Sequence, residues 1–197
     1  MGEGRLRVVG IGGTLREGSS SLGALRRALE SAEDSGAETE LLDLRELNLP
    51  MYEPGRVLGE YAPEVREFLE AVRGADALIL STAAYHGTPA GVTKNALDFM
   101  QFLSRDERPY LHGRVVGLIA TSGGGQGAAN ANRAMVDAVH ALRGVVAPLM
   151  VTVPGARRVT DEAGNITDAG HNGRLDQLGA LVAGLAGRFS VPVGSAA

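Results

Sequence analysis

Between a strand-like pattern and a helix-like pattern lie ten residues, Gly12-Gly13-Thr14-Leu15-Arg16-Glu17-Gly18-Ser19-Ser20-Ser21. A turn at such a junction points backbone N–H groups and the positive end of a helix dipole at one place. The hydroxyls of Thr14, Ser19 and Ser21 add hydrogen-bond donors there, and Arg16 adds a fixed positive charge. Charge-assisted hydrogen bonds from such groups suit a phosphate with close to two negative charges. The stretch therefore predicts an anion-binding loop.

The kind of phosphate follows from what this loop lacks. A nucleoside triphosphatase needs a Lys followed by Ser or Thr after the second glycine, and the loop has no Lys. Gly10 and Gly12 supply two glycines of the dinucleotide fingerprint, but Leu15 stands where the third is needed. Hydroxyl residues in its place favour a monophosphate held by side chains. The alternative is a Gly- and Ser-rich turn that binds nothing, and Arg16 counts against it.

The bulk composition narrows the class of protein. The 197 residues suit one domain, residues 1–197, and a net charge of −4 with scattered Lys and Arg argues against nucleic acid as a partner. Because Cys is absent, disulfides, thiolate metal sites and Cys nucleophiles are excluded, which favours a cytoplasmic protein. The chain has no apolar run long enough to span a membrane, and Met1–Arg5 show no signal-peptide pattern.

Strand and helix patterns alternate along the chain. Runs of β-branched and aliphatic residues predict strands at 6–11, 39–44, 77–81, 115–121 and 145–153. Amphipathic segments predict helices at 20–35, 63–74, 90–103, 128–143 and 173–189. This order indicates an α/β fold, a doubly wound five-stranded parallel sheet with helices on both faces.

In such a sheet, ligands bind beyond the carboxyl ends of the strands, beside the point where the strand order reverses. Besides the first loop, residues 82–91 and 121–127 have the unusual, glycine-bearing composition expected there. Residues 45–59 are interpreted as a surface connection and 159–168 as a small hairpin without chemistry. The tail, 191–197, is expected to fray.

Three segments together carry a family resemblance: Gly13–Ser19 (GTLREGS), Tyr85–Asp98 (YHGTPAGVTKNALD) and Ser122–Gly125 (SGGG). They resemble the NADPH-dependent FMN reductase family of flavodoxin-like proteins, and the resemblance covers nearly the whole chain, including the acidic 161–168. It implies a flavodoxin-like fold with FMN as cofactor. It also implies an oxidoreductase that transfers a hydride from NADPH or NADH through FMN to a small acceptor, such as free flavin or a quinone.

The resemblance also implies which residues bind the cofactor. They are Thr14, Arg16, Ser19, Ser20 and Ser21 for the phosphate, Ala83, Ala84, Tyr85, His86 and Gly87 beside the isoalloxazine ring, and Ser122, Gly123, Gly124 and Gly125 at its pyrimidine end. Many relatives have Pro-Glu-Tyr-Asn where this chain has Ala83-Ala84-Tyr85-His86, so the Glu and Asn side chains that would make polar contacts there are replaced by Ala84 and His86.

The flavin carries the chemistry in such enzymes, so no catalytic residue is required. His86 could donate a proton to a reduced acceptor, although a hydrogen-bonding role in its loop is the simpler interpretation. The four histidines are far apart in sequence, and no metal site is expected.

The predicted helix 90–103 has apolar residues on more than one side. Lys94 and Asp98 are four residues apart and are expected to form a surface ion pair. Phe99 to Leu103 cover a second stripe, which predicts a contact with another copy of the chain in a homodimer or homotetramer.

Two other functions stay open from the sequence. A flavodoxin-like electron carrier would bind FMN without oxidising a nicotinamide, but such carriers are strongly acidic and sandwich the ring between aromatic residues. A dehydrogenase binding NAD directly would use Asp43 as its ribose ligand, and the missing third glycine makes it the weakest hypothesis.

Overall fold

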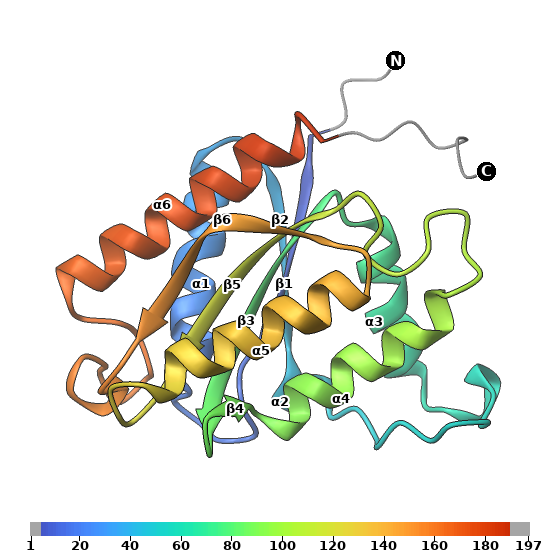
Figure 1. The fold of residues 1–197 in the computed structure, drawn as a ribbon, viewed down its shortest axis with the longest axis horizontal. Coiled ribbons are helices and arrows are strands. Elements are labelled where there is room, and N and C mark those ends of the chain that lie inside the picture. The colour runs from blue at the N-terminus through green and yellow to red at the C-terminus, as the bar shows by residue number, and fades with distance from the viewer. Residues whose placement is uncertain (1–4, 190–197) are drawn as a thin grey trace.

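A parallel sheet forms the centre of the protein in the computed structural model, which describes residues 5–189 (Figure 1). Its strands are β1 (Arg7–Gly12), β2 (Glu38–Asp43), β3 (Ala77–Tyr85), β5 (Val115–Thr121) and β6 (Val145–Val153). They are parallel and lie in the order β2-β1-β3-β5-β6. This is the flavodoxin-like order, which confirms the predicted fold. The tail predicted to fray, residues 191–197, lies outside the described residues.

Helices cover both faces of the sheet (Figure 1). One face packs against α1 (Ser20–Asp34) and α6 (Ala169–Ala186), and the other against α3 (Pro63–Gly74), α4 (Gly91–Phe99) and α5 (Gly127–Ala141). Neighbouring strand residues alternate between the two cores, Val8 facing α1 and α6 and Val9 facing α3. Shorter helices are α2 (Leu44–Leu47), η1 (Leu58–Glu60), η2 (Met100–Leu103) and η3 (Ala156–Arg158). In residues 5–189 no helix has the length and hydropathy needed to cross a bilayer.

Some boundaries differ from the sequence prediction. β3 continues to Tyr85, beyond the predicted end at Ser81, because it pairs with β5 as far as Thr121 and then with the two-residue strand β4 (Thr88–Pro89). The start of α6 was predicted at Gly173 but lies at Ala169. Asp168 caps it by accepting a hydrogen bond from the His171 N–H at 2.8 Å, and this bond lowers the pKa of Asp168.

The apolar helix 90–103 is covered differently from the prediction. It is α4 followed by the 3-10 turn η2, and its second apolar side packs within this chain. The rings of Tyr52 and Tyr61 lie edge-on against Phe99, with centroids 5.6 and 5.1 Å away, and also against Phe102. Tyr52 belongs to the segment 45–59 that was interpreted as a surface connection, and Tyr61 follows just after it. Together they cover the side that the sequence assigned to another subunit. The expected Lys94–Asp98 ion pair is present at 2.6 Å.

At the amino ends of β3 and β5 lies a buried arginine, Arg114, with 1% of its surface exposed. Its guanidinium donates three hydrogen bonds, to the carbonyl oxygens of Ala75 at 2.9 Å, Tyr110 at 2.9 Å and Arg73 at 2.7 Å. Burial lowers the pKa of Arg114 to about 10, so it stays charged at neutral pH. This side chain joins three segments at one end of the sheet.

Candidate functional site

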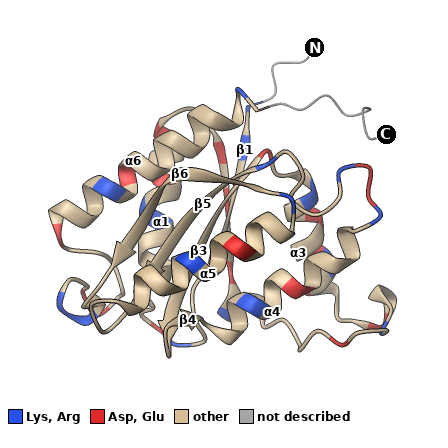
Figure 2. Cartoon of the chain, in the orientation of Figure 1, with Lys and Arg blue, Asp and Glu red and all other residues tan. Residues whose placement is uncertain are grey.

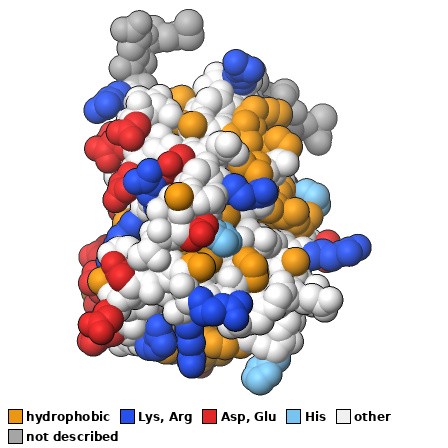
Figure 3. Space-filling model, turned by 90° about the vertical axis from the view of Figure 1, so that its left-hand side faces the viewer, with side chains coloured by type: hydrophobic (Ala, Val, Ile, Leu, Met, Phe, Trp, Pro, Cys, Tyr) orange, Lys and Arg blue, Asp and Glu red, His pale blue; other side chains and the backbone are white. Residues whose placement is uncertain are grey.

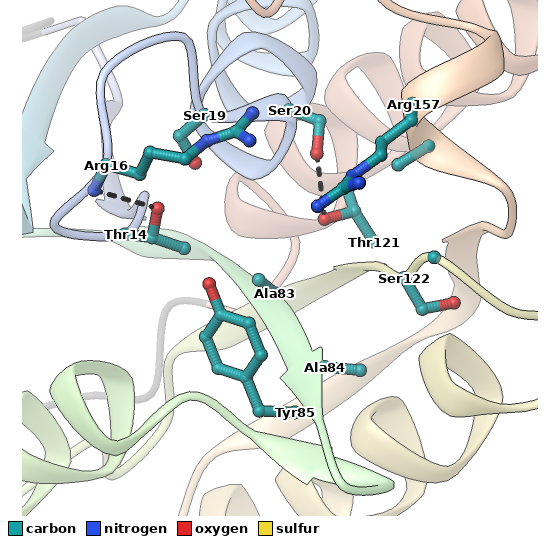
Figure 4. A pocket seen from close by; sticks show the side chains of 12 residues that line it. Thr14, Arg16, Ser19, Ser20, Ala83, Ala84, Tyr85, Thr121, Ser122 and Arg157 are labelled. Atoms are coloured by element: carbon teal, nitrogen blue, oxygen red, sulfur yellow. Dashed lines mark hydrogen bonds between the residues drawn. The ribbon is translucent and has the colours of Figure 1, made fainter.

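A pocket of about 460 Å³ opens at the other end of the sheet, where the strands finish (Figure 4). It is lined by Thr14, Arg16, Ser19, Ser20, Ala83, Ala84, Tyr85, Thr121, Ser122, Gly123, Ala156 and Arg157. The three loops predicted from the sequence thus contribute to one cavity, and the segment after β6 contributes as well. The cavity lies beyond neighbouring strands β1 and β3, where the strand order reverses.

The first loop places donors around the start of α1. Gly13 and Gly18 have φ of +93° and +60°, so the loop takes a path that glycine adopts without strain. The backbone N–H of Arg16 donates to the Thr14 hydroxyl at 3.3 Å, and the Arg16 guanidinium donates to the Gly18 carbonyl at 3.1 Å. Ser19 stands at the N-cap of α1, yet no side chain caps that turn. The N–H groups of the first turn are therefore suited to an anion.

Ser21 lies behind this turn rather than in the pocket. It is fully buried, and its hydroxyl lies 2.9 Å from that of Ser19 in a hydrogen bond. Its carbonyl accepts a hydrogen bond from the Ser81 hydroxyl at 2.7 Å. The side chain of Ser21 therefore orients Ser19, whereas Ser19 and Ser20 line the cavity.

The hairpin at 159–168 supports the first loop from outside. Thr160 and Ile166 pair as an antiparallel bridge, as predicted for this segment. A Cβ atom at Gly23 would lie only 2.0 Å from the Gly164 carbonyl oxygen, and one at Gly18 would lie 2.5 Å from that of Glu162. The backbone of the hairpin therefore packs directly against the backbone of the first loop and the start of α1, and this contact fixes the position of the loop.

The end of β3 forms one wall of the pocket. Ala83 and Ala84 are half-buried, and Tyr85 is 53% exposed with its ring directed toward Thr14 (Figure 4). His86 and Gly87 have φ of +52° and +81° and form the turn into β4. Neither of them lines the pocket. The structure therefore places His86 at an exposed turn that directly follows the pocket residue Tyr85, and its position beside the ring stays a prediction.

The loop after β5 gives an open shelf of main chain. Gly123, Gly124 and Gly125 are exposed, and a Cβ atom built on any of them would meet no atom within 4 Å. Of these three, only Gly123 lines the pocket as it stands. The Ser122 hydroxyl donates to the Gly124 carbonyl at 2.7 Å and holds the turn. A flat ligand can therefore approach this backbone closely.

Sequence reasoning missed three lining residues: Thr121, Ala156 and Arg157. Thr121 accepts a hydrogen bond from the Ser20 hydroxyl at 3.2 Å, which links the end of β5 to the start of α1. Ala156 and Arg157 lie in η3, after the last strand. The carboxyl ends of parallel strands share one edge, so the loop after the fifth predicted strand was a candidate that its lack of a motif concealed.

The charged residues that line the pocket are basic. The pocket lining includes Arg16 and Arg157 and no Asp or Glu from the described part of the chain, residues 5–189. Figure 2 shows basic residues on the loop after β6, and Figure 3 shows basic side chains at the bottom of the molecule, where the strands end. This arrangement favours an anionic ligand.

Comparison with known proteins gives the family. The family model described as NADPH-dependent FMN reductase matches residues 6–157, more than half of the chain. The chain belongs to this family. An NAD(P)H-dependent FMN reductase of Pseudomonas aeruginosa is 34% identical over 126 residues, covering 64% of this chain and 65% of that relative. An NADPH azoreductase of a Bacillus species is 32% identical over 127 residues, covering 64% and 67%.

A probable NADPH:quinone oxidoreductase of Oryza sativa is 33% identical over 124 residues, covering 62% of this chain and 59% of that relative. About a third or more of each of these relatives lies outside the match. The fold is shared with an oxidoreductase of Corynebacterium diphtheriae, at a TM-score of 0.73 and 18% identity over 95% of this chain and 100% of that one. It is also shared with a flavoenzyme NAD(P)H:(acceptor) oxidoreductase of Paracoccus denitrificans, at 0.73 and 20% over 94% and 100%.

The residues of this family member fit FMN on two structural observations. The first turn of α1 has no side-chain cap and is surrounded by hydroxyls and Arg16, as a single phosphate requires. The space above Gly123–Gly125 is open to a flat ring. Leu15, which stands where the dinucleotide fingerprint has its third glycine, does not obstruct packing, because it is 59% exposed. Gly12 makes the close approach to Ser81.

Proposed function

We propose that this chain is an FMN-dependent NAD(P)H oxidoreductase that reduces a small acceptor such as free flavin or a quinone. The observation that supports it most is the combination of two features in one cavity. An uncapped helix start with hydroxyls and Arg16 adjoins an open glycine shelf. The first suits a monophosphate and the second a flat ring, and FMN has both.

Each group of residues has a defined task in this proposal. Thr14, Arg16 and Ser19, with the N–H groups of α1, hold the phosphate, and Ser21 orients Ser19. Ala83 to Tyr85 border the ring, and the main chain of Ser122–Gly125 faces its pyrimidine end. When bound, FMN supplies the redox chemistry, accepting a hydride from NADPH or NADH and passing electrons to the acceptor.

The small side chains that line the pocket favour a broad range of acceptors. Ala83, Ala84 and Gly123 leave room over the ring site, and only Tyr85 adds an aromatic side chain. Such a wall admits many flat acceptors rather than one. The relatives are named as reductases of FMN, quinones and azo compounds, which supports a broad range.

We also propose that the protein forms a homodimer or homotetramer. Next to the phosphate loop lies a groove of about 350 Å³ that includes Leu15, Met51 and Val92, and Leu15 and Met51 are 59% and 72% exposed. Exposed apolar side chains beside a site suit a contact with another copy. We also propose a cytoplasmic location, supported by the absence of Cys from the sequence.

Two steps test the function. Purified protein loaded with FMN is expected to show flavin absorption that stays with the protein through gel filtration. NADPH or NADH added without oxygen is then expected to bleach that absorption within a turnover time. Protein that retains FMN but stays yellow would be an electron carrier, and protein that cannot be loaded would remove both functions.

A further inference from the structure

We infer that Arg157 is a second cationic ligand of the FMN phosphate, reaching it from the opposite side of the pocket to Arg16. This inference rests on the proposed function, because it assigns a residue to the same site. Arg157 belongs to η3, after the last strand, far in sequence from the loop that carries the recognisable phosphate-binding residues.

The placement of the side chain carries the inference. Arg157 lines the pocket, and its guanidinium is directed toward Ser20 and Thr121, whose hydroxyls are hydrogen-bonded at 3.2 Å (Figure 4). Ser20 is the first residue of α1, where the uncapped N–H groups lie. Arg16 approaches this turn from the other side. The two guanidinium groups therefore flank the start of one helix.

The charge of the ligand calls for a second cation. A phosphate monoester carries about −1.5 to −2 at neutral pH, and Arg16 with roughly half a charge from the α1 dipole balances only part of it. Among the described residues, 5–189, no salt bridge engages the Arg157 side chain. Its donors are therefore available to the remaining phosphate oxygens.

The chain offers a matched control in the next residue. Arg158 carries the same charge in the same turn and is also exposed, but it does not line the pocket. Its guanidinium lies over Gly155, where a Cβ atom would be 2.6 Å from Arg158 Nη2. Removing Arg158 thus lowers the charge of this edge as much as removing Arg157, without removing a group from the site.

The experiment compares FMN with riboflavin, which has the same ring and ribityl chain but no phosphate. Wild type, Arg157→Ala and Arg158→Ala are titrated with each flavin by calorimetry, after circular dichroism shows that the variants are folded. Arg157→Ala is expected to weaken FMN binding by about tenfold or more, as for a lost charge-assisted contact. Riboflavin binding is expected to stay within about twofold, and Arg158→Ala is expected to change neither affinity by more than about threefold.

Three results would overturn the inference. FMN affinity could be unchanged in Arg157→Ala, riboflavin affinity could fall by the same factor as FMN affinity, or Arg158→Ala could cost as much as Arg157→Ala. The last result would mean that the positive charge of this segment attracts FMN at long range, without direct contact between Arg157 and the phosphate. Wild type that binds no FMN would instead defeat the proposed function, so the two failures are distinguishable.

Discussion

The two ends of the sheet use arginine in opposite ways. At the amino end, Arg114 is 1% exposed, and the chain itself supplies three carbonyl acceptors for its guanidinium. At the carboxyl end, Arg16 and Arg157 are exposed and line a pocket. The Arg16 guanidinium donates one hydrogen bond within the described part of the chain, to the Gly18 carbonyl oxygen. An arginine whose donors are satisfied internally holds the fold, whereas one whose donors face a cavity is available to a ligand.

Glycine shows the same contrast within the carboxyl end. Gly23 is pressed against the backbone of Gly164, so a methyl group has no room there. Gly124 has open space, so the protein itself does not require a glycine at that position. A glycine of the first kind serves packing, and one of the second kind leaves space that a bound ring can use.

The largest effect is expected from Arg114→Met. Three carbonyl groups would lose their donor, each at about 1–2 kcal/mol, so the free energy of unfolding should fall by about 3–6 kcal/mol. Urea unfolding measures it, with Arg66→Met on the exposed side of α3 as a control expected within about 0.5 kcal/mol of wild type. FMN affinity of the folded fraction should be unchanged. If the free energy of unfolding falls by less than about 1 kcal/mol, Arg114 does not have the structural role that the comparison assigns to it.

The second largest effect is expected from Gly23→Ala, because the added Cβ would clash with the Gly164 carbonyl oxygen, which no side-chain rotation can move. We expect a loss of about 3 kcal/mol in unfolding free energy, the upper part of the range for overpacking, together with weaker FMN binding as the loop shifts. Gly184→Ala, a helical glycine of α6 with open space, is the control and should stabilise the protein by about 0.5 kcal/mol or more. Equal stability of the two variants would contradict the hairpin's supporting role.

Arg16→Ala should leave the apoprotein as stable as wild type and weaken FMN binding by about 1.5–3 kcal/mol, through loss of a charge-assisted contact. Fluorescence titration of FMN gives the dissociation constant. Lys94→Ala removes a positive charge from the exposed pair with Asp98 outside the pocket lining, and should leave FMN affinity unchanged. Wild-type FMN affinity in Arg16→Ala would exclude it from the site.

The smallest effect is expected from Gly124→Ala, which adds a methyl group to the open shelf. FMN binding should weaken by about 1.4 kcal/mol, roughly tenfold. The melting temperature of the apoprotein should not fall, because alanine reduces the conformational entropy of the unfolded chain and so favours the folded state. Gly59→Ala, also in open space but outside the pocket lining, should leave FMN affinity unchanged. Identical FMN affinity in both variants would mean that the ring does not approach this main chain.

Much of this arrangement was predictable because it is local. The strand patterns and glycine-bearing loops predicted the parallel sheet and three walls of the pocket, since parallel strands end at one edge. The first loop carries its donors within ten residues, so its chemistry was readable from the sequence. Ser21 is the exception: whether its hydroxyl faces the pocket or Ser19 depends on the rotation of the first turn of α1, which the sequence does not determine.

The remainder depends on contacts between distant segments. Arg157 reaches the site because η3 folds back toward α1, and its segment has no motif to signal this. Tyr52 and Tyr61 cover the second side of the helix at 90–103 from a segment without regular periodicity. The apolar stripe was therefore interpreted as a subunit contact, although the same chain supplies the partner.

The crystal structure of the complex with FMN tests the central claim most directly, namely that the loops at the carboxyl end of the sheet form one mononucleotide site. We predict phosphate oxygens within hydrogen-bond distance of the Thr14 and Ser19 hydroxyls and the N–H groups of α1, with the ring between Ala83–Tyr85 and Gly123–Gly125. Electron density for FMN elsewhere on the protein, or a phosphate bound away from the start of α1, would contradict this account.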